Sequence, residues 1–183
     1  VVGAEEIVPG PGLPYDTVLG ELAANPGMSP EQFSRDIVDK FHTFYDSNMA
    51  ALQGMGALKA NAGTTLSAVR SSASADFVAV LNAWAREARK PANFPVLKAA
   101  MARTLAFEYG NNGGNGNDTS TGARSRDLYD FVKNINDEAA ATPALKALGA
   151  DLMDFIDSGS YIINNKTTGP NAAYARAKGM AVY

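Results

Sequence analysis

Apolar residues recur along much of this chain at the three- and four-residue spacing that is typical of amphipathic helices. The clearest helix signal is Ser29-Pro30-Glu31-Gln32, where Ser29 can cap a helix, Pro30 suits its first position and Gln32 can complete a capping box. The apolar stripe that follows consists of Phe33, Ile37, Phe41, Phe44 and Tyr45. We therefore predict a long helix after Ser29 that buries this stripe.

The same spacing predicts further helices on both sides of this one. A first helix is expected from Tyr15 to Ala24, where Asn25-Pro26-Gly27 ends it. Two later helices are expected, one with an apolar face of Phe77, Val80, Leu81, Trp84 and Ala88 and one from Pro95 to Tyr109. Two more are expected near the end of the chain. One is capped by Ser125 and buries Leu128, Phe131, Val132 and Ile135, and the other begins at Thr142-Pro143 and buries Leu145, Leu148, Leu152, Phe155 and Ile156. Most of the chain is thus predicted to be helical.

Short apolar or β-branched runs predict strands, and two of these runs lie at the ends of the chain. We predict strands over Val1–Val8, Thr64–Val69 and Tyr161–Ile163, a turn over Thr167–Pro170, and a final strand in Gly179–Tyr183. Strands near both termini with helices between them predict a helix-rich α/β layer fold in one domain. Because terminal strands need neighbours, we expect the sheet to be completed by residues that are not in this chain.

The segment between the first predicted strand and the first helix combines grouped carboxylates with a shaped turn. Pro9-Gly10-Pro11-Gly12 is typical of a turn, because proline fixes the backbone and glycine frees it. Glu5, Glu6 and Asp16 flank this turn, and grouped carboxylates can hold a cationic group such as an arginine side chain. The alternative is that Glu5 and Glu6 alternate faces, so that at least one is solvated, while Asp16 only caps a helix.

Composition narrows the class of protein. With 183 residues, 46% of them hydrophobic and 19% charged, the chain is long enough for a domain with a substantial core. A net charge of −3 without a basic cluster argues against nucleic acid as a partner. No apolar run approaches the roughly 20 residues of a membrane span. The absence of cysteine excludes disulfides, thiolate metal ligands and a cysteine nucleophile within these 183 residues.

Other residues that could carry chemistry have weak support. His42 is the only histidine, and a structural role is favoured over a general base because no serine or cysteine partner is near it in sequence. No serine stands in a nucleophile motif. The loop over Asn111–Thr121 has oxygen atoms that suit calcium but lacks the regular spacing of a calcium loop, so a solvated loop is favoured and no metal site is predicted.

The N-terminal run resembles a known family. Gly3-Ala4-Glu5-Glu6, followed by Pro9-Gly10-Pro11-Gly12-Leu13-Pro14-Tyr15-Asp16, is similar to the clostripain-like cysteine peptidases, relatives of caspases and gingipains. In that family a strand ending in acidic residues is followed by a P-G-x-G-x-x-Y-[DE] loop and a helix. Weaker matches follow in the expected order, at Ile37-Val38-Asp39, Thr65–Val69, Asp127–Phe131 and Gly179–Tyr183. The resemblance covers nearly the whole chain.

The resemblance implies part of a caspase-like three-layer α/β/α sandwich, in an endopeptidase that cleaves after basic residues, arginine and also lysine. The family's catalytic histidine and cysteine lie before the position of Val1, so no catalytic residue is expected here and the chain alone should be inactive. Residues 1–183 would be the C-terminal part of the peptidase domain, and would supply core and one pocket wall. By position, Glu5, Glu6, Tyr15 and Asp16 are expected to line the substrate pocket.

Partners and location are further expectations from the resemblance. The partners are a peptide or protein substrate and the N-terminal part of the same bacterial peptidase, which is secreted or on the cell surface. Calcium is left open as a cofactor without a motif to support it, and no other cofactor is expected. One departure is Arg70, because the family usually has an aspartate there.

Two alternatives stay open at this stage. The first is a catalytically inactive caspase-like domain used as an extracellular binding or structural module. The second is an unrelated α-rich protein. Val1–Val8 and Met180–Tyr183 as neighbouring strands of one sheet would argue against this second alternative.

Overall fold

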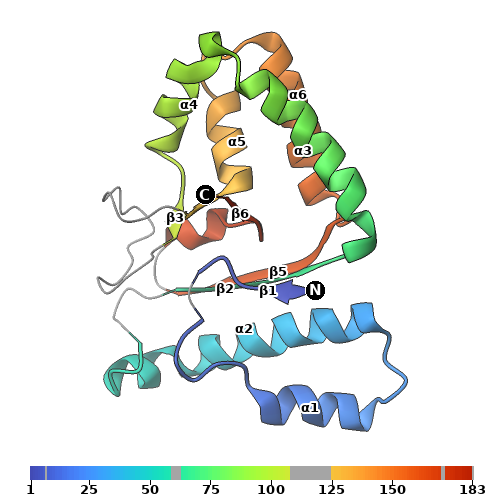
Figure 1. Ribbon diagram of the computed structural model, residues 1–183. Coiled ribbons are helices and arrows are strands. Elements are labelled where there is room, and N and C mark those ends of the chain that lie inside the picture. The colour runs from blue at the N-terminus through green and yellow to red at the C-terminus, as the bar shows by residue number, and fades with distance from the viewer. Residues whose placement is uncertain (7, 59–62, 108–124, 170–171, 183) are drawn as a thin grey trace.

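Helices lie on both sides of a layer of strands in this protein. The computed structural model shown in Figure 1 describes residues 1–6, 8–58, 63–107, 125–169 and 172–182. The α-helices of this part of the chain are α1 (Tyr15–Ala24), α2 (Pro30–Gly54), α3 (Ser74–Ala88), α4 (Phe94–Met101), α5 (Leu128–Asn136) and α6 (Pro143–Asp157), and the short 3-10 helices are η1 (Ser71–Ala73), η2 (Pro91–Asn93) and η3 (Ala172–Arg176). Helices α1 and α2 cover one side of the strands, and α3 to α6 stand on the other. The predicted α/β class, rich in helix and with strands near both termini, is confirmed.

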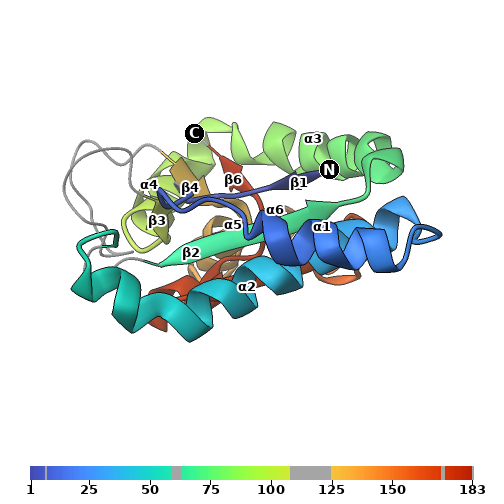
Figure 2. The same cartoon turned by 90° about the horizontal axis from the view of Figure 1, so that it is seen from below.

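The strands form two small antiparallel sheets. The first has the order β1 (Val2–Gly3), β2 (Thr64–Val69) and β5 (Ile162–Thr168), and the second has the order β3 (Ala106–Phe107), β4 (Ser125–Asp127) and β6 (Ala181–Val182). Strands β1 and β6 therefore belong to different sheets, and they are not the neighbours that we looked for. Both are paired nevertheless, β1 with β2 and β6 with β4. Figure 2 shows β1 alongside β2, with α1 and α2 in front of this sheet.

The first strand is shorter than the predicted Val1–Val8. Only Val2 and Gly3 pair with β2. Beyond them the amides of Glu5 and Glu6 donate to the hydroxyl oxygen of Thr65, at 2.8 and 2.9 Å, instead of to a strand carbonyl. The chain therefore leaves the sheet immediately after Gly3.

Helix α2 begins as its sequence predicts. The Ser29 hydroxyl accepts from the Gln32 amide at 3.2 Å, and the Gln32 side chain accepts from the Ser29 amide at 2.9 Å, which completes the capping box. Phe41 and Tyr45 of the predicted stripe are fully buried. This helix packs its apolar side on β2 and β5.

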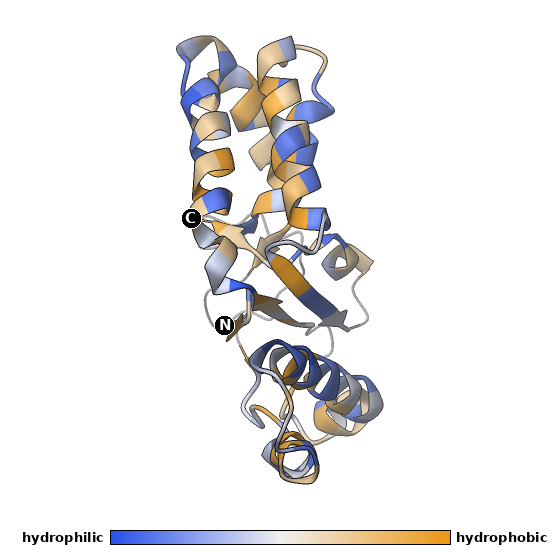
Figure 3. Ribbon diagram, turned by 90° about the vertical axis from the view of Figure 1, so that its right-hand side faces the viewer, coloured by the Kyte–Doolittle hydropathy of each residue, from blue (hydrophilic) through white to orange (hydrophobic). Residues whose placement is uncertain are grey.

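Two main clusters of apolar side chains hold the layers together. The larger lies among α3, α4, α5 and α6, and its members include Phe77, Trp84, Val96, Leu128, Phe131, Val132, Ile135, Leu145, Leu152 and Ile156. The smaller lies between α2 and the first sheet, and its members include Val38, Phe41, Tyr45, Leu52, Leu66, Ala68 and Ile163. Figure 3 shows the corresponding alternation of apolar and polar segments around the helices. The first sheet is thus stabilised by burial of α2 side chains against it, whereas Phe107 of the second sheet packs in a separate small cluster with Leu105, Tyr174 and Ala177.

The predicted helix from Pro95 to Tyr109 is wrong beyond Met101. Helix α4 ends there, and Ala106–Phe107 form β3. The Leu105 amide donates to the Asp130 carboxylate at 2.6 Å, so a side chain of α5 takes the donor that a continuing helix would have used. Tyr109 itself lies outside the described residues.

The start of α5 also differs from the prediction. Ser125 lies in β4, and the N-cap is Asp127, whose carboxylate accepts from the Asp130 amide at 2.6 Å. Pairing of β4 with β3 and β6 extends the chain through Asp127 and delays the helix by two residues. The Thr142 cap of α6 is confirmed.

Strand β5 is longer than the predicted Tyr161–Ile163. It runs over Ile162–Thr168, so Thr167 and Thr168, which we expected in a turn, pair with Thr65 and Thr64. Gly169, whose φ is +135°, follows the strand, and Pro170 of the predicted turn lies outside the described residues. The polar loop predicted over Asn111–Thr121 lies outside the described residues.

Two helical glycines provide a matched test of the packing of α6 on α5. A Cβ on Gly149 would lie 2.4 Å from the Asn136 Oδ1 atom, whereas a Cβ on Gly20 would meet nothing within 4 Å. The Asn136 side chain donates a hydrogen bond to the Lys146 carbonyl, so it cannot move away without breaking that bond. We expect Gly149→Ala to lower the free energy of unfolding by about 1–3 kcal/mol, and Gly20→Ala to raise it by about 0.5–1 kcal/mol. Urea unfolding of both variants measures this, and equal effects would contradict the close packing.

Candidate functional site

The site that the sequence singled out lies on the segment between β1 and α1, which we call the N-terminal arm (residues 4–13). The hydroxyl oxygen of Thr65, a buried residue of β2, accepts from two successive arm amides, those of Glu5 and Glu6. Farther along, the Gly12 amide donates to the Pro9 carbonyl at 2.9 Å, and the positive φ of Gly12 completes the predicted turn. The described part of the arm is therefore a shaped segment anchored to the first sheet.

Helix α2 holds the far end of the arm. The Tyr45 hydroxyl donates to the Gly12 carbonyl at 3.0 Å, and the Tyr45 ring is fully buried. Since Tyr45 belongs to the core between α2 and the first sheet, the turn of the arm is fixed by the same helix that covers the sheet.

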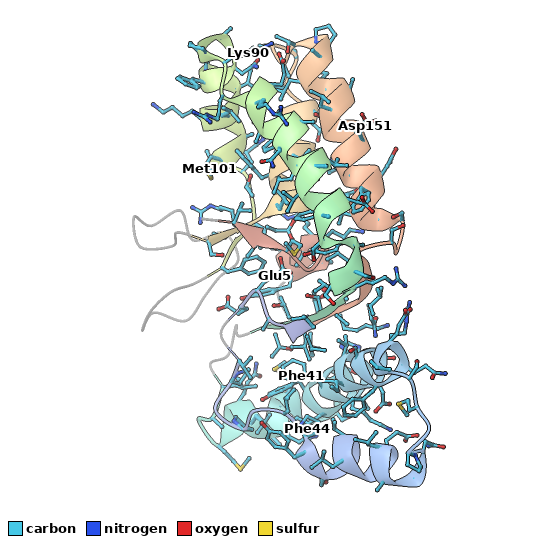
Figure 4. The ribbon with its side chains drawn as sticks, turned by 45° about the vertical axis from the view of Figure 1, so that its right-hand side comes forward. Glu5, Phe41, Phe44, Lys90, Met101 and Asp151 are labelled. Carbon is cyan, nitrogen blue, oxygen red and sulfur yellow. The ribbon has the colours of Figure 1, made fainter. Side chains whose placement is uncertain are left out.

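Glu5 reaches from the arm to the C-terminal segment. One of its carboxyl oxygens accepts from the Gly179 amide at 3.0 Å, and the carboxyl group also contacts Asp127 through a hydrogen bond. Burial, and after it the neighbouring Asp127, raises the pKa of Glu5 to about 9. Figure 4 shows Glu5 between the two sheets, on the opposite side of the first sheet from Phe41 and Phe44. This shift favours the protonated, uncharged form of Glu5 at neutral pH.

Asp127 is the partner of Glu5 and has no exposed surface. Its two oxygens accept from the Asp130 amide at 2.6 Å and from the Lys178 amide at 2.8 Å. Burial raises the pKa of Asp127, while hydrogen bonds from Glu5 and from these two amides oppose the rise. Asp127 therefore caps α5 and ties β4 to the C-terminal segment at the same time.

Glu6 also faces the C-terminal segment. Its carboxylate accepts from the Tyr174 hydroxyl at 2.9 Å, and Tyr174 is a buried residue of η3. Both glutamates thus bind the segment between Tyr174 and Gly179, and the alternative that one of them is merely solvated is not what the structure shows. The reason is that the arm has left strand conformation before Glu5, so strict alternation of faces no longer applies.

Tyr15 and Asp16 lie at the other end of the arm, in the first turn of α1. Tyr15 is 62% exposed and Asp16 is exposed. Asp16 is not the cap of the helix, because Pro14 occupies that position without a side-chain hydrogen bond. Tyr15 and Asp16 thus begin the helix that follows the arm, whereas Glu5 and Glu6 lie near the start of the arm. The structure therefore brings two of the four predicted pocket residues together.

Several residues that shape this site were missed by sequence reasoning. They are Thr65, Asp127, Tyr174 and Gly179, which lie about 60 to 170 positions from the arm in sequence. Each contributes a single hydroxyl, carboxyl or amide group, and such groups have no periodic signal. The capping position of Asp127, three residues before Asp130, was the one local pattern that could have identified a buried carboxylate.

His42 contacts a neighbouring strand, and the structural role that the sequence favoured stays a prediction. Its Nδ1 atom lies 2.7 Å from the Thr168 hydroxyl, a contact that joins α2 to β5. The side chain is partly buried at this junction.

Arg70, which stands where the resemblance expects an aspartate, lies at the opposite end of β2 from Thr65. Its guanidinium group donates to both Glu31 oxygens at 3.0 Å and to the carbonyls of Gly159 and Ser160. Arg70, and after it Arg35, holds the pKa of Glu31 below its ordinary value. Arg70 therefore links α2 to the end of α6 and takes no part in the arm.

Neither a candidate metal-binding cluster nor a candidate membrane-spanning helix occurs in the described residues. Among these residues, no three His, Asp or Glu side chains are grouped so that they could hold a metal ion. Nor does any helix in the described ranges have the length and apolar character needed to cross a bilayer. The Asn111–Thr121 loop, with its composition suited to calcium, lies outside these residues.

Comparison with known proteins identifies the class. The model of the clostripain family matches residues 1–183, the whole chain. The class is therefore that of the cysteine peptidases, whose substrates are proteins and peptides. The chain belongs to the clostripain family, as the N-terminal motif predicted. Searches of curated proteins and of solved structures found no match.

Proposed function

We propose that this chain is the part of a clostripain-type endopeptidase that follows the catalytic cysteine, and that it forms one wall of the pocket for a basic residue. The observation that carries this proposal is a family match over all 183 residues in a chain without cysteine. The nucleophilic thiolate, its histidine and the strands that complete the sheet then come from the N-terminal part of the same protein. Peptide bonds are cleaved through an acyl-enzyme intermediate.

Glu6 is the residue that we assign to recognition of the basic side chain. A guanidinium or ammonium group requires an ionised acceptor. The raised pKa of Glu5 makes it a poor acceptor for a cation at neutral pH, whereas Glu6 lies beside it on the anchored arm and accepts from the Tyr174 hydroxyl. Glu5 then fixes the arm, and the exposed Tyr15 and Asp16 extend the wall toward the remainder of the substrate.

The assignment predicts a change in specificity. In the intact peptidase, we expect Glu6→Gln to lower kcat/KM for arginyl substrates by about 10- to 100-fold, because one charge-assisted hydrogen bond contributes about 1.5–3 kcal/mol. Cleavage of substrates with a neutral residue at this position should be almost unchanged. Steady-state kinetics on paired peptides measure this. Glu21→Gln is the control, because Glu21 forms an ion pair with Lys40 on the α1–α2 surface.

The pocket assignment has a clear contrary outcome. If the Glu5→Ala and Glu6→Ala variants both cleave arginyl substrates with the kcat/KM of the unmodified enzyme, these residues do not set specificity. Asp16→Asn tests the outer wall by the same assay, and there we expect a change of less than about threefold, because exposed ion pairs contribute little.

A catalytically inactive member of the family, used as an extracellular binding or structural module, is the second candidate. The observation that favours it is Arg70, which stands where the resemblance expects an aspartate. Its guanidinium group forms an ion pair with Glu31. The encoding DNA before Val1 decides between the two. A histidine followed by a strand that ends in cysteine supports the peptidase, and their absence supports the module. A secreted or cell-surface location is part of both proposals, and cell fractionation tests it.

A further inference from the structure

The contact between Glu5 and Asp127 joins three parts of the chain that are distant in sequence. Glu5 belongs to the arm, Asp127 to β4, and both accept from amides of the C-terminal segment, at Gly179 and Lys178 respectively. Gly179 adopts a φ of +92°, and a Cβ there would lie 2.8 Å from the Cβ atom of Ser67 in β2. The Ser67 hydroxyl in turn donates to the Gly179 carbonyl at 3.0 Å. The two carboxyl groups therefore meet inside a tightly packed junction of both sheets.

Two carboxyl groups can be hydrogen-bonded to each other only if one of them carries a proton. The Glu5 Oε2 atom accepts from the Gly179 amide at 3.0 Å, and the Oε1 atom is buried without a donor at full hydrogen-bond geometry among the described residues. Both oxygens of Asp127 accept from backbone amides. Glu5 also has two backbone hydrogen bonds, from Gly179 and Met180, but burial and the neighbouring Asp127 outweigh them and raise its pKa, whereas the hydrogen bonds from Glu5 and two amides oppose the rise at Asp127. We therefore assign the proton to Glu5 and the charge to Asp127.

The cationic side chains of the surrounding elements contact other groups than the Glu5–Asp127 pair. The Arg176 guanidinium lies 3.2 Å from the Asp130 carboxylate, and the Lys178 ammonium lies 3.2 Å from Asp157. Arg126 precedes Asp127 in β4 and lines a hollow on the opposite face of that strand, beside α4.

The other titratable side chains near the pair include Asp130, Tyr129 and Glu6, and none of these three carries positive charge. Asp130 in α5 adds negative charge and raises the pKa of Asp127. Burial raises the pKa of Tyr129, next to it, from 10.0 to about 12, so this phenol stays uncharged even at pH 9. Glu6 on the arm is held by the Tyr174 hydroxyl. Two ionised carboxylates at this position would repel each other in a low-dielectric junction.

We propose that Glu5 and Asp127 share a single proton, and that this proton positions the N-terminal arm, with Glu6 on it, against the C-terminal segment. Glu5 is thus a positioning residue that acts through the arm. The statement about Glu6 as a pocket residue rests on the proposed function. The shared proton and its hold on the arm do not, since they can be measured without substrate.

The direction of the pH dependence follows from linkage. When the arm opens, Glu5 enters water and returns to its ordinary pKa of 4.5, whereas in the closed arm the pKa is about 9. Between these two values the closed form holds one more proton than the open form. The opening equilibrium of the arm should therefore rise by up to about tenfold per pH unit over this range and level off above it. The arm is held most firmly in acid.

Nuclear magnetic resonance on the isotope-labelled protein tests the proposal directly. We expect the chemical shift of the Glu5 carboxyl carbon to show a protonated carboxyl group at neutral pH. We also expect amide exchange at Glu5, Glu6 and Gly179 to increase with pH by more than the tenfold per unit that base catalysis alone produces, because opening itself rises about tenfold per unit. A Glu5 carboxyl that ionises near 4.5, or exchange that follows base catalysis alone, would overturn the proposal.

Two variants complete the experiment. In Glu5→Gln the amide nitrogen donates permanently to Asp127 and the amide oxygen can still accept from Gly179, so exchange of the arm amides should follow base catalysis alone. Glu6→Gln is the matched control on the neighbouring residue, and it should keep the extra pH dependence of the unmodified protein. Identical pH dependence in Glu5→Gln and in the unmodified protein would refute the role of the proton. None of these results depends on peptidase activity, so failure of the proposed function would be recognised separately.

Discussion

Replacing Asp127 with alanine should lower the free energy of unfolding by about 3–5 kcal/mol. This carboxylate has no exposed surface, and it accepts from the amides of Asp130 and Lys178 and from the carboxyl of Glu5. Alanine would leave these buried donors without an acceptor and would remove the N-cap of α5. Urea unfolding followed by circular dichroism near neutral pH measures the loss.

Two further variants separate burial from capping. Ser29→Ala removes a cap from α2 that lies at the surface, and it should cost only about 1 kcal/mol. Asp127→Asn keeps one acceptor oxygen of the two, so its cost should fall between the two alanine variants. If Asp127→Ala and Ser29→Ala had equal costs, Asp127 would be an ordinary cap and would not join the two ends of the chain.

Replacing Tyr45 with alanine should cost about 3–5 kcal/mol. The ring is fully buried between α2 and the first sheet, with ring centroids 4.6 Å from Phe41 and 5.1 Å from Phe44. Its removal leaves a cavity in the smaller of the two cores and also releases the Gly12 carbonyl of the arm. Thermal and urea unfolding both report this loss.

Tyr45→Phe separates the hydroxyl from the ring. We expect it to cost about 1 kcal/mol, the contribution of one hydrogen bond, and to loosen the turn of the arm while the core stays packed. Tyr15→Ala is the exposed control and should change stability by less than about 0.5 kcal/mol. A cost for Tyr45→Phe as large as that for Tyr45→Ala would show that the hydroxyl, and not ring burial, holds this region together.

The helices were predicted well because their signals are local. The capping box at Ser29 and the Thr142 cap involve residues within one turn of each other, so the sequence carries the full information for both helix starts. Apolar spacing placed Phe41, Tyr45 and Leu145 in the core for the same reason. The α/β class followed from the order of these elements.

Strand ends were predicted less well because their hydrogen-bond partners are distant in sequence. The Leu105 amide goes to Asp130 and ends the helical region of α4, although the apolar spacing continues past that point. Pairing with β2 lengthened β5, and the bond from Glu5 to Thr65 shortened β1. No local pattern distinguishes these outcomes from a continuing helix or strand.

The sequence alone determined the helix-rich α/β class, the starts of α2 and α6, and the family, since all of these depend on residues close together in the chain. Only the tertiary structure decided the environment of the two adjacent glutamates. Glu5 and Glu6 are the same residue type and are neighbours in sequence. Their environments differ because folding buries Glu5 against Asp127 and places Glu6 against the hydroxyl of Tyr174. A pKa depends on solvent and charge within a few ångströms, and those surroundings come from parts of the chain more than 100 residues away.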